Sequence, residues 1–309
     1  MKEDIVIPAW EVASSNTTMK IFNFFPSLLS TVYLSLILLY QVAWTYINVF
    51  GLKDQFFVLV IDFVHTGYFL EIMLFVLGFF LLFILVTPLA EGGLIALIDR
   101  VDRSGSDEHL TSYGIGRGLK HFLPIFEANN IMALFKLLSI VTFTLFLIRM
   151  IGTEYISEIL MGVGCYFLVA ITINILLAYT RFFIVLEGMR AFDAIVASAG
   201  MALENLSVTV RLYLTLLLVY VRTMLTVLAF ILFPFLLSAV FTYVTVASIK
   251  TLFVGILFLL LFGFILFVSH LNSVLEIFVE TLWYRSYLDN KMRAHAGHES
   301  HGINHTEAH

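Results

Sequence analysis

Charged residues are scarce in this sequence. Of its 309 residues, 13% are Asp, Glu, Lys or Arg and 61% are hydrophobic, whereas soluble domains carry about 25% charged residues. Between Leu212 and Val268, a stretch of 57 residues, the only charged side chains are those of Arg222 and Lys250. Because so long an apolar stretch cannot be the core of a soluble domain, the composition indicates a protein embedded in a membrane.

Signatures of several other protein classes are also missing. The formal net charge is −5, which gives no indication of a nucleic-acid partner. Because Cys165 is the single cysteine, a disulfide within the chain is excluded. The first residues, MKEDIVIPAWEVASSN, lack the compact apolar region of a cleavable signal peptide.

Catalytic motifs are absent from the sequence as well. It contains no nucleophile elbow, no His-Glu-x-x-His, no Walker A motif and no paired aspartates within an apolar run. Its water-soluble segments are too short to form an independent domain. We therefore predict that the protein is not an enzyme.

Long apolar runs predict where the chain crosses the bilayer. The hydrocarbon layer is roughly 30 Å thick and takes about 20 helical residues to cross. The predicted spans are residues 27–50, 68–95, 130–151, 157–181, 209–234 and 252–279. The fold class is therefore predicted to be all-α, a polytopic transmembrane helical bundle of about six spans.

Lysine and arginine are distributed unevenly between the two sides of these spans. With the N-terminus inside, thirteen fall on the cytoplasmic side and three on the outer side. Because cytoplasmic loops carry an excess of positive charge, we expect both termini in the cytoplasm and the spans in the inner (plasma) membrane. The predicted parts are a cytoplasmic segment at 1–26, the membrane domain at 27–287, and a histidine-rich, disordered cytoplasmic tail at 288–309.

Two cytoplasmic connectors contain amphipathic stretches, near residues 116–128 and near residues 189–204. Apolar residues recur at helical spacing in both, as Leu119, Phe122, Leu123 and Phe126 in the first and as Phe192, Ile195, Val196 and Ala199 in the second. Helices of this kind lie in the membrane interface. Connectors packed beneath the bundle are the alternative.

Two charged residues fall inside predicted spans. Arg222 lies eleven residues beyond Arg211, about 16 Å deeper along a helix at a rise of 1.5 Å per residue. Glu91 lies nine residues before Arg100, roughly 13 Å into the membrane by the same rise. Because unpaired charge is costly in a bilayer, we predict that Arg222 and Glu91 form a pair, either structural or part of a substrate site.

The segment YGIGRGLKH combines three alternating glycines with basic residues. It lacks the Gly-Lys-Ser/Thr of a P-loop, and no strand precedes it, which excludes a dinucleotide fingerprint. A flexible turn here would allow Arg117, Lys120 and His121 to bind lipid phosphates. The alternative is a loop before a helix that follows the positive-inside bias.

The tail contains five of the nine histidines. Candidate ligands for a divalent metal, spaced by three or four residues, are His295, His298, His301 and His305. Glycines at 297 and 302 disfavour a helix, so a solvated tail is the alternative, and no other cofactor is predicted. The end of the sixth span carries His270, Glu276 and Glu280, but without a second histidine at helical spacing we assign no metal site there.

One segment, LLAYTRFFIVLEGMRAFDAIVASAGMALENLSVTVRLYLTLLL, has a distinctive layout. An aromatic strip at 181–185 is followed by Glu187-Gly188, a short Ala/Ser helix at 194–198, and Asn205 before the next span. This segment resembles the bacterial membrane-domain family attached to some glycerophosphoryl diester phosphodiesterases, which includes stand-alone six-span proteins. The sequence departs from the family pattern in having no phosphodiesterase barrel and no proline before the Glu-Gly step. The resemblance implies a stand-alone membrane protein and brings no catalytic residues.

Two functions fit these features. The one we favour is a non-enzymatic membrane component that organises lipid or partner proteins, because spans one, three and four offer few polar residues for a transport path. The alternative is a permease-like subunit of a small-molecule or lipid transporter, working with a separate ATPase. Glu91, Arg222 and the Glu-Gly steps at 91–92 and 187–188, which suggest an internal repeat, favour this alternative. The partners expected are membrane lipids and other membrane proteins, not nucleic acid.

The predicted topology can be tested by cysteine labelling. In a Cys165→Ala background, single cysteines at Ser104 and Lys53 should react with an impermeant thiol reagent from opposite sides of the membrane, because the second span separates them. Labelling of both positions from the same side would contradict the orientation.

Overall fold

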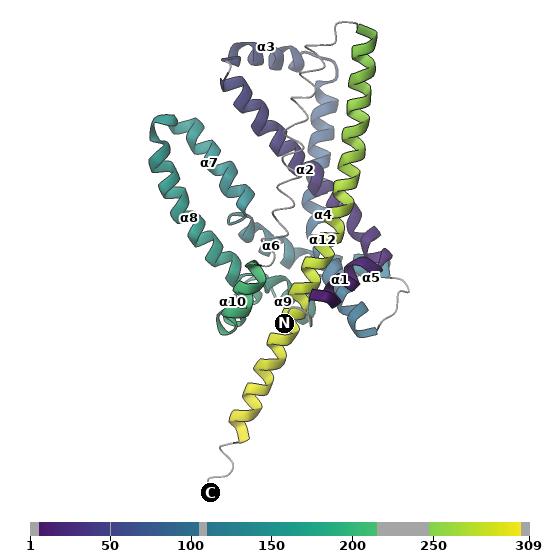
Figure 1. Cartoon of the computed structure of the whole chain (residues 1–309), viewed down its shortest axis with the longest axis vertical. Helices are drawn as coiled ribbons and strands as arrows, with labels where there is room; N and C mark the ends of the chain where they lie inside the picture. Colours follow the sequence, from purple (N-terminus) through teal and green to yellow (C-terminus); the bar gives the residue numbers. More distant parts are fainter. Residues whose placement is uncertain (1–5, 50, 105–109, 215–246, 304–309) are drawn as a thin grey trace. The chain divides into compact units, whose positions relative to one another are not determined.

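The computed structural model describes residues 6–49, 51–104, 110–214 and 247–303, and it leaves out the side chains at 49, 104, 247–250 and 294–303. Helices make up nearly all of this part (Figure 1), and no β-strand occurs within it. The prediction of an all-α fold is therefore confirmed.

Figure 1 labels the helices in the order in which they follow along the chain. They are α1 (Ile7–Ser15), α2 (Thr17–Val49), α3 (Lys53–Val64), α4 (Phe69–Ser104), α5 (Leu110–Lys120), α6 (Phe122–Ala133), α7 (Leu137–Ile151), α8 (Ile156–Leu176), α9 (Thr180–Glu187), α10 (Ala191–Glu204) and α12 (Ala247–Ile303). A further helical segment, Leu206–Leu214, follows α10.

Several of these helices are suited to crossing a bilayer. Four helical stretches are long and apolar enough, namely Thr17–Asn48, Phe69–Arg103, Thr153–Glu187 and Thr251–Arg293. Two bent pairs also qualify if each is one span, namely Phe122–Ala133 with Leu137–Ile151 at 44° and Ala191–Glu204 with Leu206–Leu214 at 94°. The part of the chain that the structure describes thus contains four to six candidate spans, as expected of a multi-pass helical membrane protein. Residues 215–234 of the fifth predicted span lie outside the described residues.

Two helices extend beyond the predicted membrane spans. The α2 helix begins at Thr17, before the predicted span at 27–50, and the Asn16 side chain caps its first turn by accepting a hydrogen bond from the Met19 N–H at 2.9 Å. The α12 helix continues to Ile303, so the backbone of residues 288–303 is helical where we predicted a disordered tail.

The chain forms two compact units, which are described separately. The first contains Met1–Met19, Pro88–Leu216 and Ile277–His309, and the second contains Lys20–Thr87 and Leu217–Glu276. The long helices α4 and α12 each contribute residues to both units.

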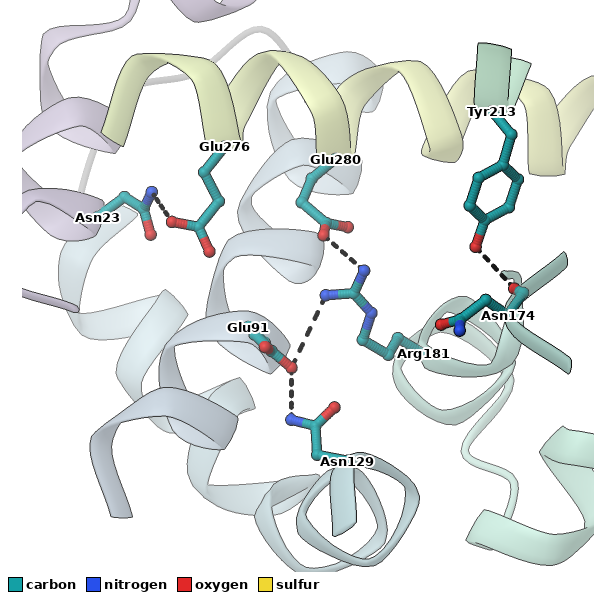
Figure 2. A network of polar contacts seen from close by, with 8 residues as sticks. All are labelled: Asn23, Glu91, Asn129, Asn174, Arg181, Tyr213, Glu276 and Glu280. Carbon is teal, nitrogen blue, oxygen red and sulfur yellow. Dashed lines mark hydrogen bonds and ion pairs between the residues drawn. The ribbon is translucent and has the colours of Figure 1, made fainter. Parts of the chain in front are cut away.

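In the second unit, α2 meets the first part of α12 along a polar seam. The Asn23 side-chain amide and the Ser27 hydroxyl both donate to Glu276 Oε2, at 2.9 and 3.0 Å (Figure 2 shows the first bond). The Asn272 amide donates to Thr31 Oγ1 at 3.1 Å. Small polar side chains are a favourable contact between membrane helices, because they satisfy one another away from water.

In the first unit, the second part of α12 lies at the centre of the core. Its large side chains Trp283, Tyr284 and Tyr287 are all buried. The Tyr287 ring stacks on Phe182 of α9 at 5.7 Å between centroids and meets Phe183 edge-on at 5.2 Å. Aromatic side chains therefore hold α9 against α12.

The glycine-rich segment folds as a helix, and not as the flexible turn or the loop before a helix that the sequence suggested. Gly114 and Gly118, four residues apart, lie on the buried face of α5, whereas Gly116 faces open space. A Cβ atom at Gly118 would lie 2.2 Å from the backbone oxygen of Leu89 and 3.3 Å from the nitrogen of Gly93. Small residues at this spacing allow two helix backbones to approach closely, and here they bring α5 against α4.

The amphipathic stretch predicted near residues 116–128 is two helices that meet at His121. Pro124 explains the break: it has no N–H to donate to the carbonyl of Lys120, and its ring would clash with that carbonyl in a continuous helix. Pro124 is instead accommodated in the first turn of α6, where the missing N–H costs little.

The two Glu-Gly steps that suggested an internal repeat have different structures. Gly188 ends α9 in the left-handed conformation, with φ of 72°, and its N–H donates to the carbonyl of Ile184 at 3.1 Å. Gly92 lies inside α4, where an added Cβ would come within 2.6 Å of the Ile125 side chain. One glycine ends a helix and the other makes room for a neighbour, so the similarity of sequence does not reflect a similarity of local structure.

The crossing of α4 and α5 leads to a prediction about stability. Gly118→Ala should lower the free energy of unfolding by about 1–3 kcal/mol or more, because its Cβ would overlap backbone atoms that cannot turn away. Thermal unfolding in detergent would measure the change. Gly116→Ala is the matched control, because nothing lies within 4 Å of its Cβ position; it should be neutral or stabilise by up to about 1 kcal/mol. Equal effects of the two variants would contradict the close crossing.

Candidate functional site

Arg181 is the charged residue around which the first unit is organised. It is the second residue of α9, which is separated from α8 by a break at residues 177–179. Ser198 of α10 bridges this break: its hydroxyl accepts a hydrogen bond from the Tyr179 N–H at 3.0 Å and donates one to the carbonyl of Leu176 at 2.7 Å. Ser198 thus satisfies backbone groups that the break leaves without helical partners.

Two carboxylates share the Arg181 guanidinium (Figure 2). Its Nη2 lies 2.8 Å from Glu280 Oε1 of α12, and its Nη1 lies 3.7 Å from Glu91 Oε2 of α4. The Asn129 amide of α6 donates to the same oxygen of Glu91 at 2.6 Å. These four residues, which we call the Arg181 network, join four helices of one unit, and the three charged side chains are largely buried.

A neutral polar cluster surrounds Tyr179, which is completely buried. Its hydroxyl lies 3.1 Å from Thr209 Oγ1 and 3.0 Å from Ser286 Oγ, and it accepts a hydrogen bond from the Asn290 amide at 3.2 Å. In the bonds of Tyr179 with Thr209 and with Ser286, either hydroxyl can be the donor.

Charged contacts continue along the second part of α12. The Tyr284 hydroxyl donates to Asp99 Oδ1 at 2.9 Å, and Arg285 lies 3.2 Å from Asp102. One turn further on, Glu187 accepts hydrogen bonds from Tyr287 and from Lys291. The polar side chains of α12 in this unit therefore bond to both α4 and α9.

The basic residues predicted to bind lipid phosphates lie at the junction of α5 and α6. Lys120 is exposed, Arg117 is half-buried and His121 is buried. Burial lowers the pKa of His121, and the nearby positive charges of Arg117 and Lys120 lower it further. His121 is therefore neutral at pH 7, so the fixed positive charges of this group are those of Arg117 and Lys120.

The α10 helix exposes large apolar side chains while it buries small ones. Its buried residues are Ala191, Ala194, Ser198 and Ala202. On another face Phe192, Val196 and Leu203 are 71%, 73% and 62% exposed. The predicted amphipathic helix is thus present at nearly the predicted residues, with its apolar face turned away from the protein.

The other predicted site residues are only partly described. Arg222 lies outside the described residues, so its pairing with Glu91 stays a prediction, and Glu91 has Arg181 and Asn129 as partners in the structure. The predicted metal ligands His295, His298 and His301 lie on α12, but their side chains, and the whole of His305, lie outside the description. Within the described residues, no group of three or more His, Cys, Asp or Glu side chains could hold a metal ion.

Sequence reasoning did not identify Arg181 and Asn129 as parts of a site, and it considered Glu280 only as a weak metal ligand. Arg181 ends the fourth predicted span, at 157–181, so the predicted topology places it among the thirteen cytoplasmic positive charges. A usable signal was present: Glu280 and Arg181 each interrupt a strip rich in aromatic residues, where an unpaired charge would be costly.

No known protein family, curated protein or solved structure matches this chain. The resemblance to the membrane domain of glycerophosphoryl diester phosphodiesterases therefore stays a hypothesis.

The Arg181 network can be tested by a double-mutant cycle. Arg181→Gln should lower the free energy of unfolding by about 3–5 kcal/mol, because it leaves two buried carboxylates without their shared cation. Arg181→Gln combined with Glu280→Gln should cost less than the sum of the single changes, with a coupling of about 1 kcal/mol or more. Arg190→Gln, which removes an exposed arginine, is the control and should change stability by no more than about 0.5 kcal/mol. Additive effects at Arg181 and Glu280 would show that the two side chains do not interact.

Proposed function

We propose that this protein is a non-enzymatic membrane component that organises the lipid around it, with α10 lying in the cytoplasmic interface of the bilayer. The observation that carries this proposal is the reversed packing of α10. A helix that faced water would bury its large apolar side chains, whereas α10 buries alanine and serine and exposes Phe192, Val196 and Leu203. Leaving such side chains in water forgoes about 1.5–3 kcal/mol each, so this face requires an apolar cover.

The direction of α10 supports lipid as that cover. It is bent by 94° from the helical segment Leu206–Leu214, with which the fifth predicted span begins. If that span crosses the bilayer, α10 runs nearly parallel to the membrane surface. Amphipathic helices with this orientation place their apolar face about 5–10 Å into the boundary between headgroups and acyl chains.

The bonding of the buried polar groups supports a structural role. The buried polar groups of the first unit that we have described bond mainly to one another, in the Arg181 network and around Tyr179. An arrangement of this kind positions helices.

A permease-like subunit is the second candidate, and the Arg181 network favours it. Charges that lie between several membrane helices are characteristic of transport paths. The geometry gives this candidate less support, because the charges of the network already contact one another. The Arg181 guanidinium lies between two carboxylates, and Asn129 donates a hydrogen bond to one of them.

The position of α10 can be tested with spin labels. In a Cys165→Ala background in reconstituted bilayers, a nitroxide at Val196→Cys should collide more often with oxygen, which dissolves in lipid, than with a water-soluble nickel chelate. The same label at Asp193→Cys, an exposed polar position of the same helix, should show the opposite preference. Equal access of the nickel chelate to both positions would contradict the interfacial placement of α10.

A further inference from the structure

The junction of α5 and α6 contains basic side chains without acidic partners. Arg117 and Lys120 lie in the last turn of α5, and His121 follows directly. None of the three forms an ion pair or a side-chain hydrogen bond with any residue that the structure describes. By contrast, Arg103, Arg181, Arg285 and Lys291 all pair with carboxylates in the same unit. A concentration of unbalanced positive charge attracts anions from outside the protein.

The arrangement of Arg117 and His121 brings their side chains to one place. The His121 N–H donates to the carbonyl of Arg117 at 3.2 Å, which is the hydrogen bond of a helical turn. Residues four apart in such a turn lie on the same face. His121 is only 6% exposed, and both its Nε2 and the Nε of Arg117 are buried without a hydrogen-bond partner in the described structure. Unsatisfied nitrogen atoms of this kind are costly unless a ligand binds them.

The start of α6 adds a second attraction for an anion. The helix has twelve residues, and His121, at its N-cap position, makes no side-chain hydrogen bond to its first turn. The N-terminus of a helix carries partial positive charge and unpaired N–H groups, and anions bind there. This chain places two cations and an imidazole at or just before this position.

An apolar surface continues from the basic group. Ile115 and Leu119 are exposed on α5, and Leu123 is exposed in the first turn of α6. Phosphate binding alone does not require exposed apolar side chains nearby. A phospholipid does, because its acyl chains lie beside its headgroup.

We infer that Arg117, Lys120 and His121 bind the phosphate group of an anionic phospholipid, with its acyl chains against Ile115, Leu119 and Leu123. Two fixed positive charges match a phosphomonoester headgroup of the phosphatidic acid type, which carries nearly two negative charges. Arg117 and Lys120 neutralise the charge, and His121 supplies a third hydrogen-bonding group. This inference rests on the proposed function, because it assigns one lipid that the protein organises.

Lipid titration of the full-length protein in detergent, followed by native mass spectrometry, tests the inference. Phosphatidic acid should bind more tightly than phosphatidylglycerol, and phosphatidylcholine should bind least. Arg117→Gln combined with Lys120→Gln should weaken phosphatidic acid binding by about tenfold or more, because two charge-assisted hydrogen bonds are lost. The charge-matched control is Arg190→Gln combined with Arg293→Gln, since both of these arginines are exposed; its affinity should stay within about twofold of the wild type.

Each outcome distinguishes between explanations. Equal loss of binding in both double variants would overturn the inference, because net charge alone would then explain the loss. Unchanged binding in the variant of Arg117 and Lys120 would overturn it as well.

Inorganic phosphate provides a competition test. If it competes with phosphatidic acid, and binds the wild type but not the variant of Arg117 and Lys120, the result would support the phosphate site and assign it to a soluble ligand. Lys120→Gln alone removes an exposed side chain and should still weaken binding measurably, which provides a test if the double variant does not fold. The spin-label result at Val196 does not depend on Arg117, so a failed lipid site would leave the proposed function standing.

Discussion

The positive charge of Arg181 must be balanced within a chain that has few charges, and this requirement determines how the helices of the first unit meet. Glu280, Glu91 and Asn129 come from three different helices, and each contributes one contact to the network. Arg181 lies in the first turn of α9. The Ser198 hydroxyl of α10 accepts a hydrogen bond from the Tyr179 N–H just before that turn, and so helps to position Arg181. The same helix that exposes its large apolar side chains therefore also fixes the residue on which the charge balance depends.

This connection gives α10 two roles on its two faces. The face with alanine and Ser198 packs closely because small side chains allow helix backbones to approach one another. The face with Phe192 and Val196 cannot contribute to the core from that side. An exposed apolar surface and a buried network are thus joined by one helix of fourteen residues.

The sequence was a good guide to features that depend on hydropathy and spacing. Long apolar runs predicted the all-α membrane fold, and the spacing of Phe192 and Val196 predicted α10, because a helix repeats its faces at regular intervals. The sequence also predicted that Glu91 has a charged partner. It did not predict that this partner is Arg181 in the described structure, because no local pattern determines which distant charges meet. The break at His121 was missed although Pro124 signalled it, and the helix that contains Gly114 and Gly118 was missed because alternating glycines favour a turn in isolation.

The position of Glu280 near the end of α12 has a consequence for biosynthesis. At about 5–20 residues per second, the roughly 100 residues that separate Arg181 from Glu280 take about 5–20 s to translate. Glu91 and Asn129 emerge from the ribosome before Arg181, whereas Glu280 and the aromatic residues of α12 emerge long after it. The nascent chain therefore enters the membrane with its core incomplete and with Arg181 lacking its nearest carboxylate. Translation speed over this interval sets how long the insertion machinery must protect the half-assembled helices.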